Sequence, residues 1–97
     1  MALPITISKV KENLRIKHNK LDNEIADEIE ACKADLIVCG ISDPQEESPL
    51  ILAAIKLWCR AGFSDDVAKS TAFMERYNAQ KACLMMAEGY GGNTEND

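Results

Sequence analysis

The sequence predicts an all-α fold, in which four helices form a small bundle within a single domain. The length of 97 residues is typical of one domain. Apolar residues recur every three or four positions over long stretches, as they do on the buried face of an amphipathic helix. Only 5% of the residues are aromatic, which suits a core of Leu, Ile, Ala, Met and Cys packed between helices.

The first helix is expected to be short and to cover residues 8–14. Thr6 or Ser8 can cap it, and Val10 and Leu14 lie four positions apart on one face. The apolar residues before this helix alternate along the chain and are expected to lie extended against the body: Leu3, Ile5 and Ile7.

The second helix has the clearest pattern and is expected over residues 21–39. Carboxylates crowd its first half, where they interact favourably with the positive end of the helix dipole. Gly40 is expected to end the helix in a left-handed conformation, with Ile41 folding back on the last turn. The apolar stripe of this helix consists of Leu21, Ile25, Ile29, Cys32, Leu36 and Cys39.

The third helix is predicted to lie at the centre of the bundle. Ser48 and Pro49 are typical of an N-cap and a first helical residue, and they follow a loop of turn-forming residues. The segment PLILAAIKLWCRAG is apolar around most of its circumference, because only Lys56 and Arg60 are charged. Such a helix is expected to have neighbours on several sides, and Gly62 is expected to end it.

The last helix is expected over residues 65–88, with Ser64 as its cap and Phe63 packed on Ala68 as a hydrophobic staple. Lys81 interrupts the inward stripe, so the far end of the helix is expected to rise off the core. The predicted stripe consists of Val67, Thr71, Met74, Tyr77, Leu84 and Met85, with Phe73 beside it.

Gly89 is expected to end the last helix and to separate a helical domain, residues 1–90, from a flexible tail, residues 91–97. Since no apolar residue follows Tyr90, the tail cannot offset the entropy that it would lose on ordering.

The net charge of −5 is unevenly distributed, with +4 over residues 1–20, −8 over residues 21–48 and −1 over residues 49–97. An acidic chain repels a phosphate backbone, which disfavours general nucleic-acid binding. The chain has no apolar stretch long enough to span a membrane and no secretory signal at its amino terminus. We therefore expect a cytoplasmic protein without a membrane partner.

No group of residues predicts catalysis, a metal site or a cofactor. His18 is the only histidine and lies among lysines, so neither a Ser–His–Asp set nor a zinc site is expected. Cys32 and Cys39 would lie about 10.5 Å apart on one helix, which is too far for a disulfide, and the cysteines are expected to be buried free thiols.

The carboxylates are expected to be solvated, and no helix follows GYGGN to bind phosphate. We expect no enzymatic activity.

Three classes of non-enzymatic protein remain after these exclusions. An acyl-carrier-like domain would carry its prosthetic group on Ser48, but the usual preceding Asp is absent and a proline follows. A small DNA-binding or regulatory module would use the turn in RAGFSDDVAKS, although Asp65 and Asp66 would then face the phosphates. The third class is an assembly module, whose function lies in its surfaces.

Two segments carry motifs that favour the third class. The pattern PL-x-x-x-A-(I/V)-K occurs in the third helix, at Pro49, Leu50, Ala54, Ile55 and Lys56. The pattern Y-x-x-Q-K-A-x-L-x-M-A-x-G-Y occurs near the end of the last helix, at Tyr77, Gln80, Lys81, Ala82, Leu84, Met86, Ala87, Gly89 and Tyr90. With the opening ITISKVKENLRI, these motifs resemble the siphophage head–tail connector family, small adaptor proteins that sit beneath the portal.

The resemblance implies a structural protein of a phage or prophage that forms a homo-oligomeric ring during virion assembly and head completion. It implies contacts with the portal on one side and with the next connector, stopper or tail protein on the other. DNA would pass through the channel during packaging without specific binding. The protein would lie in the virion, and in the cytoplasm of the bacterial host during assembly. Family members use the carboxyl-terminal tail and the loop between the second and third helices for contacts, here residues 89–97 and 41–48. The residues expected to contact the portal or another partner are Gly89, Tyr90, Gly91, Gly92 and Asn93.

A ring requires two complementary surfaces on each subunit, repeated head to tail until closure. The basic amino-terminal segment and the acidic second helix are candidates for this pair, and their charges would guide orientation and association rate more than affinity. The residues predicted for this interface are Lys9, Lys11, Arg15 and Lys17 on the basic side and Asp27, Glu28 and Glu30 on the acidic side.

Overall fold

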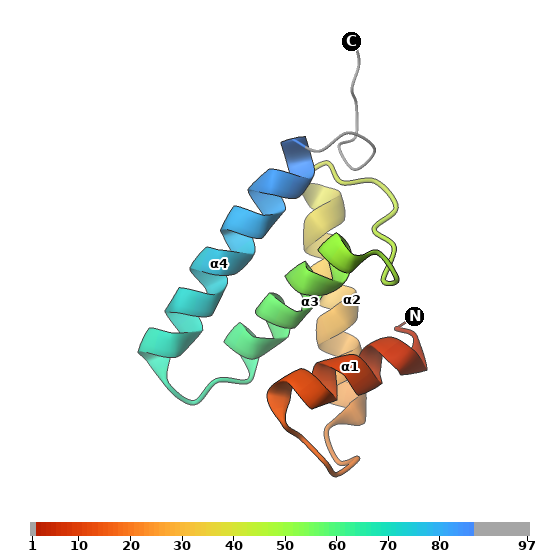
Figure 1. Ribbon diagram of the computed structural model, residues 1–97, viewed down its shortest axis with the longest axis vertical. Helices are drawn as coiled ribbons and strands as arrows, with labels where there is room; N and C mark the ends of the chain where they lie inside the picture. The colour runs from red at the N-terminus through yellow and green to blue at the C-terminus, as the bar shows by residue number, and fades with distance from the viewer. Residues whose placement is uncertain (1, 87–97) are drawn as a thin grey trace.

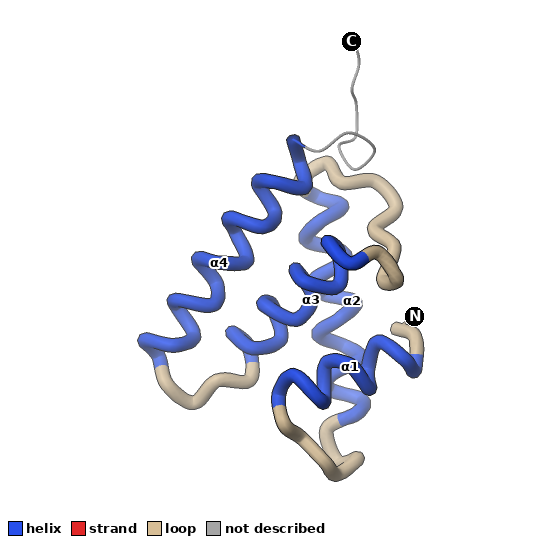
Figure 2. The backbone as a smooth tube through the Cα atoms, viewed as in Figure 1, coloured by secondary structure: helices blue, strands red, loops and turns tan. Residues whose placement is uncertain are grey.

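The computed structural model describes residues 2–86, which form four α-helices and no β-strand (Figure 1). This arrangement confirms the predicted all-α bundle, and Figure 2 shows the helices with the loops that join them. The predicted boundary between residues 1–90 and the tail 91–97 lies outside the described residues. No helix within residues 2–86 is both long and apolar enough to cross a membrane. The helices are α1, Pro4–Leu14; α2, Asp22–Val38; α3, Pro49–Gly62; and α4, Val67–Met86.

The helix α1 begins at Pro4, so the prediction that Leu3, Ile5 and Ile7 lie extended is wrong. Proline suits the first helical position, because its φ is already helical and the N–H that it lacks would have no partner within the helix. Ile7 then packs against the core, whereas Ile5 is exposed. The alternation of apolar residues was therefore misleading, and the helical spacing from Leu3 to Ile7 was the informative signal.

The ends of α1 also differ from the prediction. Leu3 is the N-cap, in place of Thr6 or Ser8, and it has no side-chain oxygen with which to bind the first turn. At the other end Arg15 adopts a left-handed conformation with a φ of 61°, which is uncommon for a residue other than glycine. The amino end therefore depends on contacts outside the helix, whereas at the carboxyl end the N–H groups of Arg15 and Ile16 donate to the carbonyl oxygens of Glu12 and Lys11.

The helix α2 follows its predicted pattern closely. Gly40 has a φ of +99°, and the N–H of Ile41 donates to the carbonyl oxygen of Leu36 at 3.0 Å, as expected for a chain that folds back after the helix ends. Ile41 is fully buried. The buried residues of the helix are Ile25, Ile29, Cys32 and Leu36.

The helix α3 begins at Pro49, ends at Gly62 and contacts each of the other three helices, which confirms its predicted central position. Its burial explains why so few of its residues are charged. The residues that it buries are Ile51, Ala54, Ile55, Cys59 and Ala61.

The helix α4 begins at Val67, and its cap is Asp66 in place of the predicted Ser64. The Oδ1 of Asp66 accepts hydrogen bonds from the backbone N–H groups of Ala68 at 2.8 Å and Lys69 at 3.3 Å. Because the cap lies two positions later than predicted, the residue predicted as a hydrophobic staple does not directly precede the cap and cannot form the staple.

Only part of the predicted inward stripe of α4 faces the core. Tyr77 and Leu84 are buried and Met74 is partly buried, but Val67, Thr71 and Met85 are exposed. Phe63, the predicted staple residue, packs against the core from the loop before α4. The prediction that the far end of this helix rises off the core is wrong, because Leu84 is only 1% exposed.

Candidate interaction surfaces

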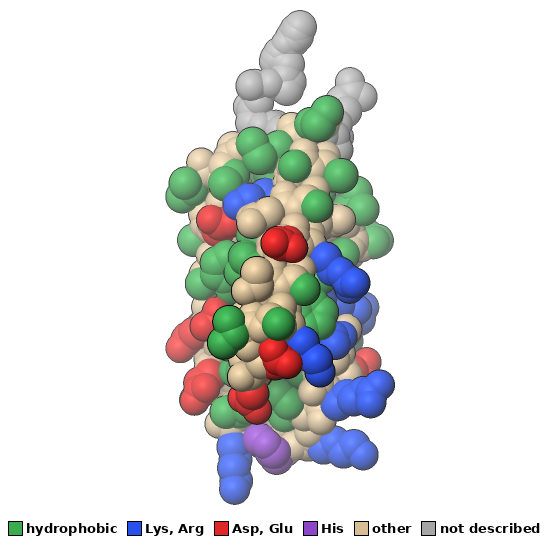
Figure 3. Space-filling view, turned by 90° about the vertical axis from the view of Figure 1, so that its left-hand side faces the viewer, with side chains coloured by type: hydrophobic (Ala, Val, Ile, Leu, Met, Phe, Trp, Pro, Cys, Tyr) green, Lys and Arg blue, Asp and Glu red, His purple; other side chains and the backbone are tan. Residues whose placement is uncertain are grey.

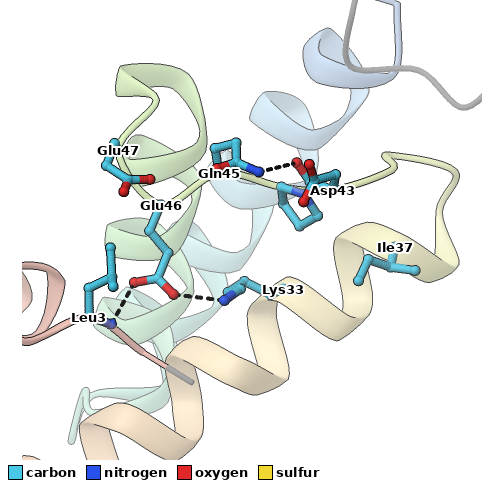
Figure 4. Close-up of a pocket in the computed structure, with 8 residues that line it drawn as sticks. Leu3, Lys33, Ile37, Asp43, Gln45, Glu46 and Glu47 are labelled. Carbon is cyan, nitrogen blue, oxygen red and sulfur yellow. Dashed lines mark hydrogen bonds and ion pairs between the residues drawn. The ribbon is translucent and has the colours of Figure 1, made fainter.

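The loop between α2 and α3 is attached to the body by a buried carboxylate, Glu46, which is 5% exposed. Its Oε1 accepts a hydrogen bond from the backbone N–H of Leu3 at 3.0 Å, and its Oε2 binds the Nζ of Lys33 at 2.7 Å (Figure 4). The hydroxyl of Thr6 also donates to this carboxylate. Glu46 thus supplies, from a distant loop, the cap that the start of α1 lacks locally.

The environment of Glu46 keeps it ionised at neutral pH. Burial alone would raise its pKa, but the hydrogen bonds from Leu3, Lys33 and Thr6 outweigh burial and hold the pKa below the usual range. The prediction that the carboxylates are solvated is therefore wrong for Glu46. Nothing in the local sequence around it distinguishes it from Glu47, which is exposed.

An open hollow of about 300 Å³ lies beside this carboxylate (Figure 4). Lys33 is its only cationic wall residue, and Glu46 already binds that side chain. The hollow contains no histidine or cysteine, so it presents neither a base near neutrality nor a thiol nucleophile. Its walls are formed by Leu3, Lys33, Ile37, Asp43, Pro44, Gln45, Glu46 and Glu47.

A second polar cluster attaches the far half of α4 to α2. The hydroxyl of Tyr77 donates to the Oδ2 of Asp35 at 2.7 Å, and the Nζ of Lys81 donates to the same oxygen at 3.1 Å. Lys81, predicted to lift this end off the core, instead holds it in place. Burial alone would raise the pKa of Asp35, but the hydrogen bonds from Tyr77 and Lys81 lower it overall. The cluster is therefore an ionic clamp that joins α4 to α2.

All four cysteines are free thiols, as predicted, but they are not all buried. Cys32 and Cys59 are buried, Cys39 is partly buried and Cys83 is exposed. Burial raises the pKa of Cys32 and of Cys59 to about 12. These two thiols stay protonated at neutral pH and are therefore poor nucleophiles. Residues 2–86 contain no group of three or more His, Cys, Asp or Glu side chains that could hold a metal ion.

Exposed large apolar side chains lie at the end of α2, the start of α3 and the end of α4. The three helices meet there, since the Nε2 of Gln80 donates to the carbonyl oxygen of Leu50 at 3.2 Å and Lys81 binds Asp35. Figure 3 shows hydrophobic side chains around this end of the molecule. We call this surface the apolar end; its exposed members are Ile37, Val38, Leu50, Met85 and Met86.

Most of the charged residues predicted for a subunit interface lie at the surface. Lys9, Arg15 and Lys17 are exposed on α1 and the turn after it, and Asp27 is exposed on α2. Seen from the side of α4, the Lys and Arg side chains lie mostly along one edge of the molecule, with several Asp and Glu side chains along the opposite edge (Figure 3). On the face that Figure 3 shows, most of the basic side chains thus lie apart from most of the acidic ones.

Three of the predicted interface residues have contacts within the chain. Lys11 is 13% exposed, and its Nζ lies 2.9 Å from the Oδ1 of Asp22. Glu28 accepts a hydrogen bond from the Nε1 of Trp58 at 2.8 Å, and Glu30 lies 3.5 Å from Lys33. Lys11 and Glu28 therefore contribute to the fold itself, which the charge pattern of the sequence did not indicate.

The residues predicted to contact the portal or another partner, from Gly89 to Asn93, lie outside the described residues. Comparison with protein families, curated proteins and solved structures finds no match to this chain.

Proposed function

We propose that this chain is a ring-forming structural protein of a phage or prophage, a head–tail connector between the portal and the next connector, stopper or tail protein. The apolar end is the observation that carries the proposal. Val38 is 84% exposed and Met86 is 86% exposed, and three further large apolar side chains are exposed at the same helix ends. A group of exposed apolar residues on one surface is typical of a site that another protein covers.

The position of the connector-like motifs supports the same proposal. The first motif lies on α3 and the second on α4, and Gln80 of the second bonds to the backbone of Leu50 in the first. Leu50 and Met86 belong both to these motifs and to the apolar end. The segments that carry the resemblance thus supply part of the proposed partner surface.

The separated charges support head-to-tail association in a ring. Lys9, Arg15 and Lys17 would approach the acidic surface of α2, including Asp27, on a neighbouring subunit. Lys11 contributes less than its neighbours to such a contact, because Asp22 already binds it. Surface charges of this kind would set the orientation and rate of association.

The proposal is tested by binding to the portal protein encoded near the gene of this chain. Replacement of Val38 and Met86 by Gln keeps good helix propensity and removes two of the most exposed apolar side chains. The matched control is Val67→Gln, because Val67 is 80% exposed and lies at the opposite end of α4 from Met86. We expect the double variant to lose portal binding at least tenfold and the control to bind like the original chain. Equal binding by all three proteins, or no portal gene in the neighbourhood, would refute the proposal.

The two alternative classes have their own tests. An intact mass increased by a phosphopantetheine group on Ser48 would establish a carrier domain in place of a connector. Tight, salt-dependent retention on duplex DNA would establish a DNA-binding module, because phosphate contacts make binding salt-dependent.

A further inference from the structure

A second hollow, of about 470 Å³, lies where α1 and α3 end and α4 begins, away from the apolar end (Figure 1). Three cationic side chains line it, against one carboxylate, that of Glu12. We call it the basic pocket. Its walls are formed by Glu12, Asn13, Leu14, Arg15, Arg60, Phe63, Ser64, Lys69 and Phe73.

The cations of the basic pocket are not neutralised by the fold. Within residues 2–86, the side chains of Arg15, Arg60 and Lys69 form no ion pair, unlike those of Lys11, Lys33 and Lys81. The guanidinium carbon of Arg60 lies 4.5 Å from the ring centroid of Phe73. Stacking on an aromatic face orients a guanidinium and leaves the N–H groups at its edge available to a carboxylate.

Asn13 adds a polar side chain to the wall between these cations. It lines the basic pocket, and its Oδ1 is buried without a hydrogen-bond partner among the described residues. The cations therefore carry the recognition, and a peptide with carboxylate side chains offers their partners.

We infer that the basic pocket binds the carboxyl-terminal segment, residues 87–97, of a neighbouring copy of this chain. That segment contains Glu88, Glu95 and Asp97 and no Lys or Arg. Residues two apart in an extended peptide point to the same side, about 6.8 Å apart, so Glu95 and Asp97 suit a pocket with several cations. The inference rests on the proposed function, since it names a neighbouring subunit as the partner of this segment.

The reach of the chain favours a neighbouring copy over the same molecule. Along α4, Lys69 lies about 26 Å from Met86 at the helical rise. Glu95 follows Met86 by nine residues, which span at most about 32 Å when fully extended. To reach the pocket of its own chain, the segment after Met86 would have to reverse direction and extend almost fully, at a large cost in conformational entropy. A segment from a neighbouring copy has no such restriction.

The test is a titration of the full chain into a fluorescently labelled peptide of residues 87–97, followed by anisotropy at low salt. Arg60→Glu combined with Lys69→Glu should weaken binding about tenfold, because each pair changes from attraction to repulsion. Arg76→Glu is the matched control, since Arg76 also lies over Phe73, at 5.9 Å, but does not line the pocket. We expect its affinity for the peptide to change less than twofold.

A peptide in which Glu95 and Asp97 are replaced by Lys should show the reverse preference and bind the double variant better than the original chain. Far-UV circular dichroism checks the fold of every variant, and Gln at positions 60 and 69 replaces Glu if the double variant does not fold. Equal binding of the original peptide to the original chain, the double variant and the control would overturn the inference.

Sedimentation velocity identifies the source of the segment. Excess peptide should suppress association between full chains if the pocket accepts a neighbour's segment. Unchanged sedimentation would show that a neighbouring copy is the wrong occupant. Portal binding through the apolar end is measured separately. The inference about the basic pocket can therefore be refuted while the connector proposal stands, and the connector proposal can be refuted while peptide binding to the pocket stands.

Discussion

Replacement of Glu46 by Gln tests whether one distant carboxylate holds the start of α1. Glu46 is almost fully buried and binds the N–H of Leu3 and the ammonium group of Lys33. A hydrogen bond to a charged group contributes about 1.5–3 kcal/mol. Gln keeps a carbonyl oxygen for one partner but turns an NH₂ donor toward the other, so about one such bond is lost. We expect a loss of roughly 2 kcal/mol in the free energy of unfolding.

The effect should depend on pH in a defined direction. The pKa of Glu46 is lower in the folded chain than in the unfolded chain, where it is about 4.3. Its ionic contribution is therefore fully present above about pH 4.3 and is lost as the pH falls through the lower, folded value. The stability difference between the original chain and Glu46→Gln should be constant near neutrality and should shrink as the pH falls below about 4.

Urea denaturation followed by circular dichroism at 222 nm measures both effects. Glu47→Gln is the matched control, because Glu47 is adjacent, exposed and of the same charge. Its expected change is below about 0.5 kcal/mol. Hydrogen exchange should also accelerate in the first turns of α1 in Glu46→Gln but not in the control. If the two variants unfold at the same urea concentration at pH 7, the proposed role of Glu46 is wrong.

Three further predictions concern the core and the ends of the helices. Tyr77→Phe removes the hydroxyl that donates to Asp35 and should lower the free energy of unfolding by about 1–2 kcal/mol, which an unchanged urea midpoint would contradict. A thiol reagent should modify Cys83 in the native chain, whereas Cys32 should react only after unfolding, because burial raises its pKa to about 12. Mass spectrometry of the treated native chain identifies the modified cysteine, and modification of Cys32 before Cys83 would refute this prediction. Gly40→Ala should destabilise the chain by about 1 kcal/mol, because a φ of +99° is strained for a residue with a Cβ; thermal unfolding tests this, and an equal or higher midpoint would be inconsistent with it.

The buried face of α2 and the central position of α3 were predictable from sequence, whereas the inward stripe of α4 was predicted only in part. Ile25, Ile29 and Leu36 lie on the buried face because their spacing matches the helical repeat. On α4 the same spacing included Val67, which is exposed, because the first turn of that helix extends beyond the core. Periodicity defines a stripe on a helix, but neighbouring helices decide how much of its length is covered.

The sequence by itself determined the number of helices, their order and the face that most of them bury, because turn residues, caps and periodicity act between positions a few residues apart. Only the tertiary structure decided the polar contacts. Leu3 and Glu46 are 43 positions apart, and Tyr77 and Asp35 are 42 positions apart, so no local pattern links them. The basic pocket is likewise defined only where the ends of three helices meet. Every carboxylate in the sequence can accept the same kinds of hydrogen bond. Tertiary packing decides which of them does so, because it brings the two partners together and removes the water between them.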